Sequence, residues 1–362
     1  MHTTPLNAWH RAHYGRMVDF AGWDMPVQYT SIVDEHNAVR SSVGLFDISH
    51  MGRLQFFGDT AESYLNTLLT NDTRMLKPGD VRYSLVCRED GGILDDVLVY
   101  RMTDRWELVV NASNREKIVA WLPSVSGFDA VTFVDRTIHT GMIAVQGPQA
   151  LTLVESVLGL SVAPMKYYTA TDATILDTPC VVSRTGYTGE DGFELTVPAD
   201  RTVDVWERLM DGGTATGIVA AGLGCRDTLR LEAAMPLYGH ELNEQTDPLT
   251  AGLGFAVKLA KADFIGRSAL ERIKANGLKQ VRVGLVLDGR RIAREETPVC
   301  VDDQTIGKVT SGTFSPTLQK SIAMASVTTG MAQPGTLLEV NLRGTRIPAV
   351  VTALPFYKRS TV

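Results

Sequence analysis

The fold class is decided by the stretch Gly91-Gly92-Ile93-Leu94-Asp95-Asp96-Val97-Leu98-Val99-Tyr100, because two β-like runs follow its glycine turn in succession. The first run, Val97–Met102, begins directly behind two adjacent carboxylates, and the second is Trp106–Asn111, with no helical segment between them. Similar runs, several alternating apolar and polar residues as half-buried antiparallel strands do, recur at Gly52–Phe57, Phe193–Pro198, Val281–Leu287, Leu337–Leu342 and Ile347–Leu354. Because these strands do not alternate regularly with helices, we expect an α+β protein rather than a doubly wound parallel sheet.

Helical patterns interrupt the strands. Asp59–Leu69 and Asp200–Met210 place apolar residues at helical spacing, and Ser113-x-x-Glu116 is a capping-box pattern that predicts a helix start. Arg267–Gly277 is helical and ends in an Asn-Gly stop, after which strands and Gly/Pro turns fill the chain. We therefore predict a domain boundary near residue 278 and an all-β last domain, barrel-like or jelly-roll-like, over residues 279–362.

The charge of the 362-residue chain is unevenly distributed. The formal net charge is −6, which argues against nucleic-acid binding, since such proteins need a basic surface to displace counterions. Residues 279–362 contain 11 Lys and Arg against 6 Asp and Glu, a net of +5, which leaves −11 for residues 1–278. This shift supports a separate last domain whose basic face could meet an acidic partner or an anionic ligand. Scattered, solvated charge would explain the same count.

The cysteine spacing and the lack of long apolar stretches indicate in which cellular compartment the protein works. Cys87, Cys180, Cys225 and Cys300 are spaced too widely for a CxxC metal or redox pair, so reduced thiols are expected. The N-terminus has no apolar run behind a basic start, and no stretch approaches about 20 continuous apolar residues. We predict a cytoplasmic protein without membrane association, although an organelle presequence removed earlier would leave no trace in the sequence.

The sequence lacks the motifs of several common classes of enzyme site. The chain has no GxGxxG for a dinucleotide and no GxSxG nucleophile elbow, and Gly307-Lys308 lacks the first glycine of a phosphate loop. His10 and His13 lie at helix-like spacing, but no HExxH motif or third ligand accompanies them, so exposed histidines are expected here rather than a metal site. Catalysis is therefore expected to depend on carboxylates, hydrogen bonds and positioning.

Asp95 and Asp96 form the first candidate site. Successive side chains along a strand point to opposite faces, so at most one of these two carboxylates can face a shared cavity. The other is then expected to cap a turn or to accept hydrogen bonds from backbone amides. A polar turn that simply enters a strand would explain the same residues.

The second candidate is Thr185-Gly186-Tyr187-Thr188-Gly189-Glu190-Asp191-Gly192-Phe193-Glu194-Leu195, which is typical of a loop folded around something flat or polar. Tyr187 could stack on an aromatic ligand, and Glu194, presented by the following strand, could accept hydrogen bonds from a ring amide and an amine. A glycine-rich hairpin with solvated acids is the alternative.

The third candidate is Gly222-Leu223-Gly224-Cys225-Arg226-Asp227, a glycine-rich turn that leads into a helix. Arg226 could clamp a carboxylate or polarise a carbonyl, whereas Thr228 and Glu232 further along the helix are expected to be structural. An Arg-Asp pair on the surface is the alternative.

Together these three segments resemble the glycine-cleavage T-protein family. Other blocks that resemble its signatures are Met17–Tyr29, Asp34–Arg40, Leu45–Gly52, Ile143–Pro148, Gly239–Glu241, Asp263–Gly266 and Thr310–Pro316. The blocks run in order from near residue 5 to near residue 356 without a large unmatched insert, so the resemblance covers nearly the whole chain.

The resemblance implies a three-domain cloverleaf of mainly antiparallel sheets around a central folate-binding hole. Two interwoven α+β domains are expected within residues 1–278, roughly 1–50 with 137–278 for one and 51–136 for the other. It also implies a reaction in which the aminomethyl group on the lipoyl sulfur of the H-protein is split, ammonia leaves, and the methylene carbon passes to tetrahydrofolate. The family uses no metal and no flavin, and its members are expected to be monomers that work in transient complexes.

The resemblance also assigns residues. Asp96 corresponds to the catalytic carboxylate, where it can accept or hold a proton of the attacking amine and stabilise positive charge on the transferred carbon. Glu194 resembles the contact to the pterin edge, and near the C-terminus Phe356-Tyr357-Lys358-Arg359 departs from the family pattern, with Arg359 carried over as a contact. The remaining residues that resemble folate-site residues of the family are Tyr83, Asn111, Tyr187, Arg226 and Asp227.

Two other functions use the same scaffold. A folate-dependent demethylase would take a methyl group directly from a small molecule, and ammonia release from aminomethyl H-protein would distinguish the two. A folate-binding accessory protein would bind folate tightly without turnover. The flavin-linked dehydrogenases that carry this scaffold as a C-terminal half are excluded, because the chain has no dinucleotide-binding domain.

Overall fold

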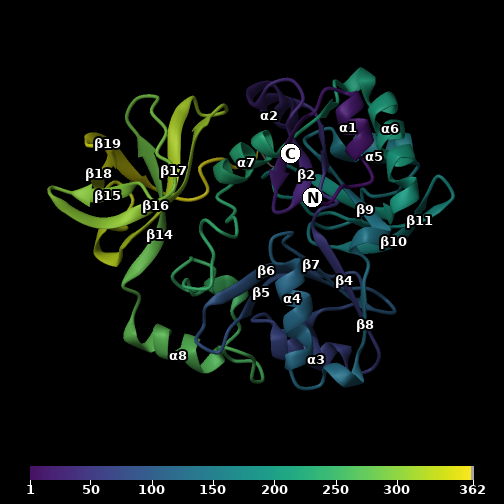
Figure 1. Cartoon of the computed structure of the whole chain (residues 1–362), viewed down its shortest axis with the longest axis horizontal. Coiled ribbons are helices and arrows are strands. Elements are labelled where there is room, and N and C mark those ends of the chain that lie inside the picture. Colours follow the sequence, from purple (N-terminus) through teal and green to yellow (C-terminus); the bar gives the residue numbers. More distant parts are fainter. Residues whose placement is uncertain (360–362) are drawn as a thin grey trace. The chain divides into compact units, whose positions relative to one another are not determined.

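The computed structural model describes residues 1–359 (Figure 1). The chain forms two compact units, the first made of residues 1–66, 72–83 and 97–227 and the second of residues 67–71, 84–96 and 228 onward.

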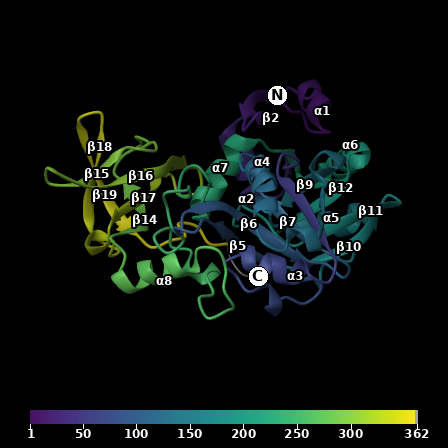
Figure 2. The same ribbon diagram turned by 60° about the horizontal axis from the view of Figure 1, so that its bottom comes forward.

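A six-stranded sheet with strand order β10-β11-β12-β9-β3-β13 forms the centre of the first unit. Its strands are β3 (Gly44–Asp47), β9 (Thr140–Gln146), β10 (Ala170–Ile175), β11 (Thr178–Ser183), β12 (Gly192–Pro198) and β13 (Val219–Ala220). Neighbouring strands are antiparallel except for the short pair β3–β13. Helices α5 (Ala150–Leu158) and α6 (Thr202–Gly212) pack on each other and on β9 (Figures 1 and 2). The fully buried side chains of Trp206 and Phe193 belong to the core between these elements.

The N-terminal part of the first unit consists of short elements. They are α1 (Asn7–Ala12), the antiparallel hairpin of β1 (Arg16–Phe20) and β2 (Trp23–Gln28), and α2 (Ile32–Ser41). The α2 helix begins after Ser31, whose hydroxyl accepts a hydrogen bond from the backbone N–H of Asp34 at 3.1 Å, as an N-cap residue does. The prediction of an exposed His10 is wrong. This residue is 0% exposed. Its polar ring can be buried because both nitrogens have partners: Nε2 lies 2.9 Å from Asp47 Oδ2, and Nδ1 lies 2.7 Å from the Tyr29 hydroxyl.

A second sheet has the strand order β5-β6-β7-β4-β8. Its strands are β4 (Gly52–Phe57), β5 (Val81–Cys87), β6 (Ile93–Arg101), β7 (Trp106–Val110) and β8 (Thr132–Asp135), and the helices that follow β4 and β7 are α3 (Ala61–Leu68) and α4 (Arg115–Trp121). Strand β6 begins at Ile93, so Asp95 and Asp96 lie inside the strand and not ahead of it as predicted. The capping box at Ser113 is also wrong. The helix follows Asn114, which has helical backbone angles and whose side chain makes no cap hydrogen bond, while its backbone N–H donates to Asn111 O at 3.0 Å.

The second unit contains a closed six-stranded barrel with strand order β14-β17-β16-β15-β18-β19. Its strands are β14 (Gln280–Leu287), β15 (Pro298–Val301), β16 (Gln304–Ser315), β17 (Lys320–Thr328), β18 (Leu337–Leu342) and β19 (Thr345–Thr352). Aliphatic side chains such as Leu285, Val309 and Val340 fill its interior with 0% exposure. Helix α8 (Arg267–Asn276) precedes the barrel, and Gly277 is its C-cap, in agreement with the predicted Asn-Gly stop. Helix α7 (Leu223–Glu232) starts in the first unit and ends in the second.

The end of α7 is tied to the barrel through a buried carboxylate. Glu232 accepts hydrogen bonds from the hydroxyl groups of Ser315 at 2.5 Å and Thr317 at 2.8 Å, and it is 0% exposed. A buried carboxylate needs such donors, because its desolvation is otherwise costly. The structural role predicted for this residue is therefore confirmed within the second unit.

The α+β class, the mainly antiparallel sheets and the all-β C-terminal barrel are confirmed. The arrangement of three domains around a hole and the division of residues 1–278 into two interwoven domains stay predictions. Within residues 1–359, no helix is both long and apolar enough to cross a lipid bilayer, and all four cysteines are buried and unbridged.

We predict that Gly312→Ala destabilises the barrel. A Cβ added to Gly312 on β16 would lie 1.9 Å from the carbonyl oxygen of Ala293, a backbone atom that cannot move aside cheaply. Overpacking of this kind costs about 1–3 kcal/mol, which urea unfolding followed by far-UV circular dichroism would measure, since the barrel itself contains no tryptophan. Gly330→Ala is the matched control, because a Cβ there meets nothing within 4 Å. Equal unfolding midpoints for the two variants would contradict the prediction.

Candidate functional site

The glycine-rich loop between β11 and β12 is folded around the side chain of Gln146. The Nε2 group of Gln146 donates to the backbone oxygen of Thr185 at 3.0 Å, and its Oε1 accepts from the hydroxyl of Thr188 at 2.9 Å. A Cβ on Gly186 would lie 2.0 Å from this amide and would displace it, whereas a Cβ on Gly192 would also lie 2.5 Å from the backbone oxygen of Val145, so Gly192 requires glycine. The polar group inside this loop is thus a side chain of the protein, and the prediction that the loop also folds around a ligand stays a prediction.

Two acidic residues of this loop are paired with arginines. Glu190, 6% exposed, accepts from Arg40 Nη1 at 2.9 Å. Asp191 accepts from Arg184 through two parallel hydrogen bonds, Nε to Oδ1 at 3.0 Å and Nη2 to Oδ2 at 2.5 Å. Bidentate pairs of this kind fix geometry as well as contributing energy. The loop is thus held at both ends before it leads into β12.

Glu194 is the buried carboxylate that β12 presents. It is 7% exposed and accepts a hydrogen bond of 2.5 Å from the hydroxyl of Thr185. Burial raises the pKa of Glu194, and this rise is opposed by the Thr185 hydroxyl and by the positive charge of Arg226. The structure therefore provides a carboxylate with one local donor and one nearby cation.

Arg226 and Tyr187 come together as a stacked pair. The guanidinium carbon of Arg226 lies 4.6 Å from the centroid of the Tyr187 ring, a cation–π arrangement. Burial lowers the pKa of Arg226, and Tyr187 and Glu194 act in the opposite direction. Tyr187 therefore has a stacking partner within the chain itself.

The start of α7, which carries Arg226, is fixed by a second buried carboxylate. Glu35 is 1% exposed, and its Oε2 accepts from the backbone N–H of Gly222 at 2.9 Å. A Cβ on Gly222 would lie 2.4 Å from the carbonyl group of Val27, so only glycine allows this close approach. The glycine turn identified in the sequence therefore has a packing reason.

His50 is a residue that sequence reasoning missed. It is 2% exposed, and its Nδ1 has no hydrogen-bond partner among residues 1–359. Burial, reinforced by the positive charge of Arg226, lowers the pKa of His50 to about 3, so the ring is neutral at pH 7. The block Leu45–Gly52 carried the family resemblance, but nothing in it distinguished this histidine from a surface one.

Three further predicted residues of the first unit are partly exposed. Tyr83 lies on β5, Asn111 directly follows β7, and Asp227 lies next to Arg226 on α7. The structure thus brings Glu194, Arg226 and Tyr187 close enough to interact. For Tyr83, Asn111 and Asp227 it gives the position along the chain and the partial exposure.

Asp96 belongs to the second unit, where it lies on the first half of β6. Its neighbour Asp95 is 0% exposed, whereas Asp96 is partly exposed, as the alternation of side chains along a strand requires. Of the two carboxylates only Asp96 is therefore accessible, and that it faces a shared cavity stays a prediction.

The start of β6 is held by the segment 238–246. The backbone N–H of Ile93 donates to Asn243 O at 3.2 Å and Thr246 O at 3.1 Å, and the hydroxyl of Tyr238 donates to Ile93 O at 3.0 Å. A Cβ on Gly92 would lie 2.0 Å from Glu244 O, which explains the second glycine of the turn. These contacts fix the backbone three residues before Asp96. Their sequence separation of about 150 residues left no local signal for them.

The C-terminal candidate also lies in the second unit. Arg359 is partly exposed, and two residues earlier the backbone N–H of Tyr357 donates to Glu232 O at 2.8 Å. As for metals, no group of three or more His, Cys, Asp or Glu side chains within residues 1–359 is arranged to hold an ion.

Comparison with known proteins gives a consistent picture. Residues 6–261 match the family model of the GCVT N-terminal domain, and residues 280–358 match that of the glycine cleavage T-protein C-terminal barrel domain. The chain is 47% identical to an aminomethyltransferase of Streptomyces avermitilis and 44% identical to one of Symbiobacterium thermophilum, in each case over 98% of this chain and 97% of the relative. Its structure is similar to the crystal structure of glycine cleavage system aminomethyltransferase T from Bartonella henselae, with a TM-score of 0.92, 34% identity, and coverage of 99% and 98% of the two chains.

We predict that His50 makes the folded state less stable in acid. Its folded pKa of about 3 lies below the ordinary value of 6.5, so the unfolded state binds a proton first. The stability that neutral His50 contributes is complete above pH 6.5 and is lost as the pH falls toward 3, by up to about 1.4 kcal/mol per pH unit. Urea unfolding at pH 7.5 and 5.5 would show a smaller loss for His50→Gln than for the wild type. The control His139→Gln, at an exposed position, should behave like the wild type. An identical loss for His50→Gln would refute the prediction.

Proposed function

The chain belongs to the glycine cleavage T-protein family and is an aminomethyltransferase of the glycine cleavage system, and on this premise we propose its substrates and the roles of its residues. The methylene carbon of the aminomethyl group on the lipoyl sulfur of the H-protein passes to tetrahydrofolate. The carbon–sulfur bond breaks to give a thiol, and the amine leaves as ammonia. The reaction involves no net oxidation or reduction, so it requires no redox cofactor.

The observation that carries this proposal is the buried carboxylate of Glu194 beside the Arg226–Tyr187 stack. A pterin ring offers an amide N–H and an amine on one edge, which suit two carboxylate oxygens. Its flat face suits an aromatic ring or a guanidinium plane. The residues of the first unit therefore fit the ring of tetrahydrofolate, which supplies the nucleophilic nitrogens when bound.

Asp96 has the catalytic role in this proposal. Its carboxylate takes up a proton of the attacking amine and stabilises the positive charge that builds on the transferred carbon as the bond to sulfur breaks. Asp95 is buried in the opposite face of β6 and supports the strand. The anchoring of Ile93 by Asn243 and Thr246 limits the movement of Asp96, and accurate positioning of this kind is where much of the rate acceleration arises.

Other parts of the proposal rest on the family resemblance. Tyr83, Asn111, Asp227 and Arg359 line the folate site, and the enzyme works as a monomer in the cytoplasm, meeting the lipoylated H-protein transiently. We propose that neither a metal ion nor a flavin takes part.

We predict that Asp96→Asn removes turnover and leaves folate binding nearly unchanged. The amide keeps the shape of the side chain but can neither take up a proton nor stabilise positive charge, so kcat should fall by about 10²- to 10⁴-fold. Ammonia release from aminomethylated H-protein measures turnover, and calorimetry with tetrahydrofolate measures binding. Glu89→Gln, an exposed residue with the same change of charge, should retain wild-type activity. Full activity of Asp96→Asn would remove this residue from the mechanism.

We predict that Arg226→Lys weakens tetrahydrofolate binding. Lysine keeps the positive charge but loses the planar group that stacks on Tyr187, so KM for tetrahydrofolate should rise about tenfold, as expected for a loss near 1.4 kcal/mol. The same substitution at the exposed Arg208 is the control. A KM within twofold of the wild type would exclude Arg226 from the folate site.

A further inference from the structure

A hollow in the second unit combines apolar walls with two lysines, and it contains none of the residues assigned to the reaction. Its volume is about 630 Å³. We call it the lysine-flanked hollow. It is lined by Leu249, Gly254, Val257, Lys258, Leu259, Ala260, Lys274, Gly277 and Leu278.

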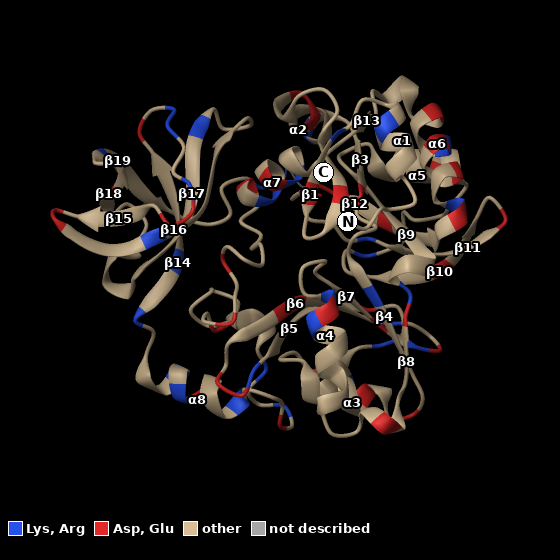
Figure 3. Ribbon diagram, viewed as in Figure 1, with Lys and Arg blue, Asp and Glu red and all other residues tan. Residues whose placement is uncertain are grey.

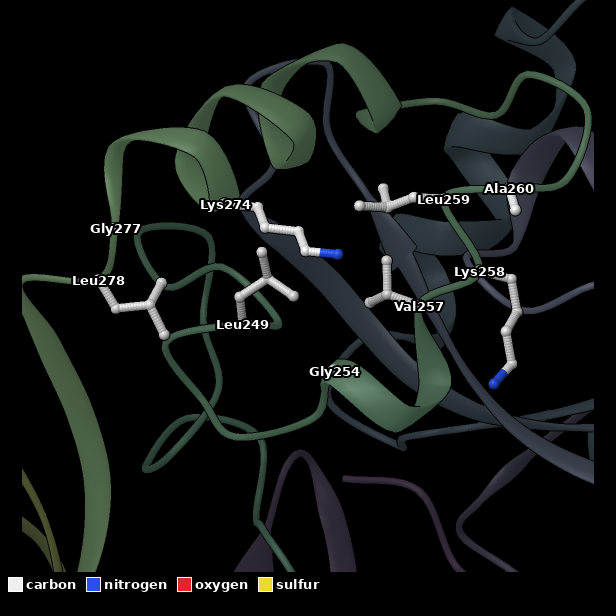
Figure 4. A pocket seen from close by; sticks show the side chains of 9 residues that line it. All are labelled: Leu249, Gly254, Val257, Lys258, Leu259, Ala260, Lys274, Gly277 and Leu278. Carbon is white, nitrogen blue, oxygen red and sulfur yellow. The ribbon is translucent and has the colours of Figure 1, made fainter. Parts of the chain in front are cut away.

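Three consecutive segments build this hollow (Figure 4). Residues 254–260 form one wall, the last turn of α8 contributes Lys274, and Leu278 lies where the chain leaves α8 for the barrel. Figure 4 shows the side chain of Lys274 extending toward Val257 and Leu259, while Lys258 lies on the other side of Val257. The aliphatic floor therefore has an ammonium group on each side.

The charge of the hollow is uncompensated. Its lining contains two lysines and no acidic residue, and both lysines are exposed. Within residues 1–359 neither ammonium group forms an ion pair with the protein. Lys and Arg also outnumber acidic residues on α8, as Figure 3 shows. In a chain of net charge −6, this is a local positive field that attracts an anionic partner.

An exposed aromatic residue lies beside the hollow. Phe255, in the short 3-10 helix η7 (Gly254–Ala256), is 65% exposed, and both Gly254, directly before it, and Val257, two residues after it, line the hollow. Protein interfaces commonly combine an aromatic and aliphatic centre with a charged rim. Phe255 and the aliphatic floor supply such a centre here, and the two lysines supply the rim.

We infer that the lysine-flanked hollow is the docking place of the lipoyl-bearing protein. This inference rests on the proposed function, which requires a second protein to hold its lipoyl arm at the enzyme during the reaction. The chemistry of the hollow suits a docking face with carboxylates around an exposed apolar side chain that enters beside Phe255. The lysines contribute mainly to the rate of encounter and to specificity, as charges at an interface rim do.

The test is a steady-state comparison of Lys258→Glu/Lys274→Glu with the wild type, using lipoylated, aminomethylated H-protein as the varied substrate. KM for the H-protein should rise by about tenfold or more, and the ratio of variant to wild-type KM should shrink as the salt concentration increases. The value of kcat at saturating H-protein and KM for tetrahydrofolate should stay unchanged. The control Lys166→Glu/Lys320→Glu makes the same change in net charge at two exposed lysines outside the hollow and should leave KM for the H-protein within twofold.

Further variants separate packing from charge. Phe255→Ser should also raise KM for the H-protein, whereas Lys258→Arg/Lys274→Arg, which keeps both charges, should retain the wild-type value. Equal KM values for the wild type and the charge-reversed variant would overturn the inference, provided that the wild type releases ammonia. A wild type that releases no ammonia would instead refute the proposed function, and direct binding of the H-protein to both forms would then still decide the docking place. Loss of a dimer on charge reversal, with KM for the H-protein unchanged, would assign the hollow to a second copy of the chain.

Discussion

Burial of the Glu194 carboxylate is the constraint on which the rest of the first unit depends. A carboxylate removed from water needs donors and a nearby positive charge, and here they are the Thr185 hydroxyl and the Arg226 guanidinium. Thr185 is in place because its backbone oxygen accepts from Gln146, and Arg226 is in place because Glu35 fixes the start of α7. Four segments distant in sequence must therefore fold correctly before this one acid is stabilised, and a group that needs so much support is well placed to bind a ligand.

In the second unit, the alternation of side chains along β6 determines which of two adjacent carboxylates is buried. Two adjacent aspartates on β6 cannot share a face, so the strand buries Asp95 and leaves Asp96 partly exposed. The hydrogen bonds from Ile93 to Asn243 and Thr246 then hold the strand's beginning. The reaction as proposed needs both carboxylates. The buried Glu194 binds the edge of the pterin ring, and the partly exposed Asp96 takes up a proton and stabilises positive charge.

Local patterns predicted much of the fold, and long-range contacts limited the rest. Strands β4 and β18 have the predicted bounds, because their apolar alternation and flanking turns are local properties. The burial of His10 could not be predicted, because its partner Asp47 lies 37 residues away. The glycine-rich loop showed that something polar lay inside it, but nothing near Gly186 in the sequence pointed to Gln146. His50 was missed for the same reason, since its neutral state arises from burial and from Arg226, which lies in another segment.

The central claim is that this chain transfers a one-carbon unit from an aminomethylated lipoyl carrier to tetrahydrofolate. The most direct measurement is a single-turnover experiment with excess enzyme, carrier labelled on the methylene carbon, and tetrahydrofolate, in which ammonia and labelled folate are quantified together. The account predicts one ammonia and one labelled methylene-tetrahydrofolate for each carrier consumed. Consumption of the carrier without label in the folate, or no consumption at all, would contradict it.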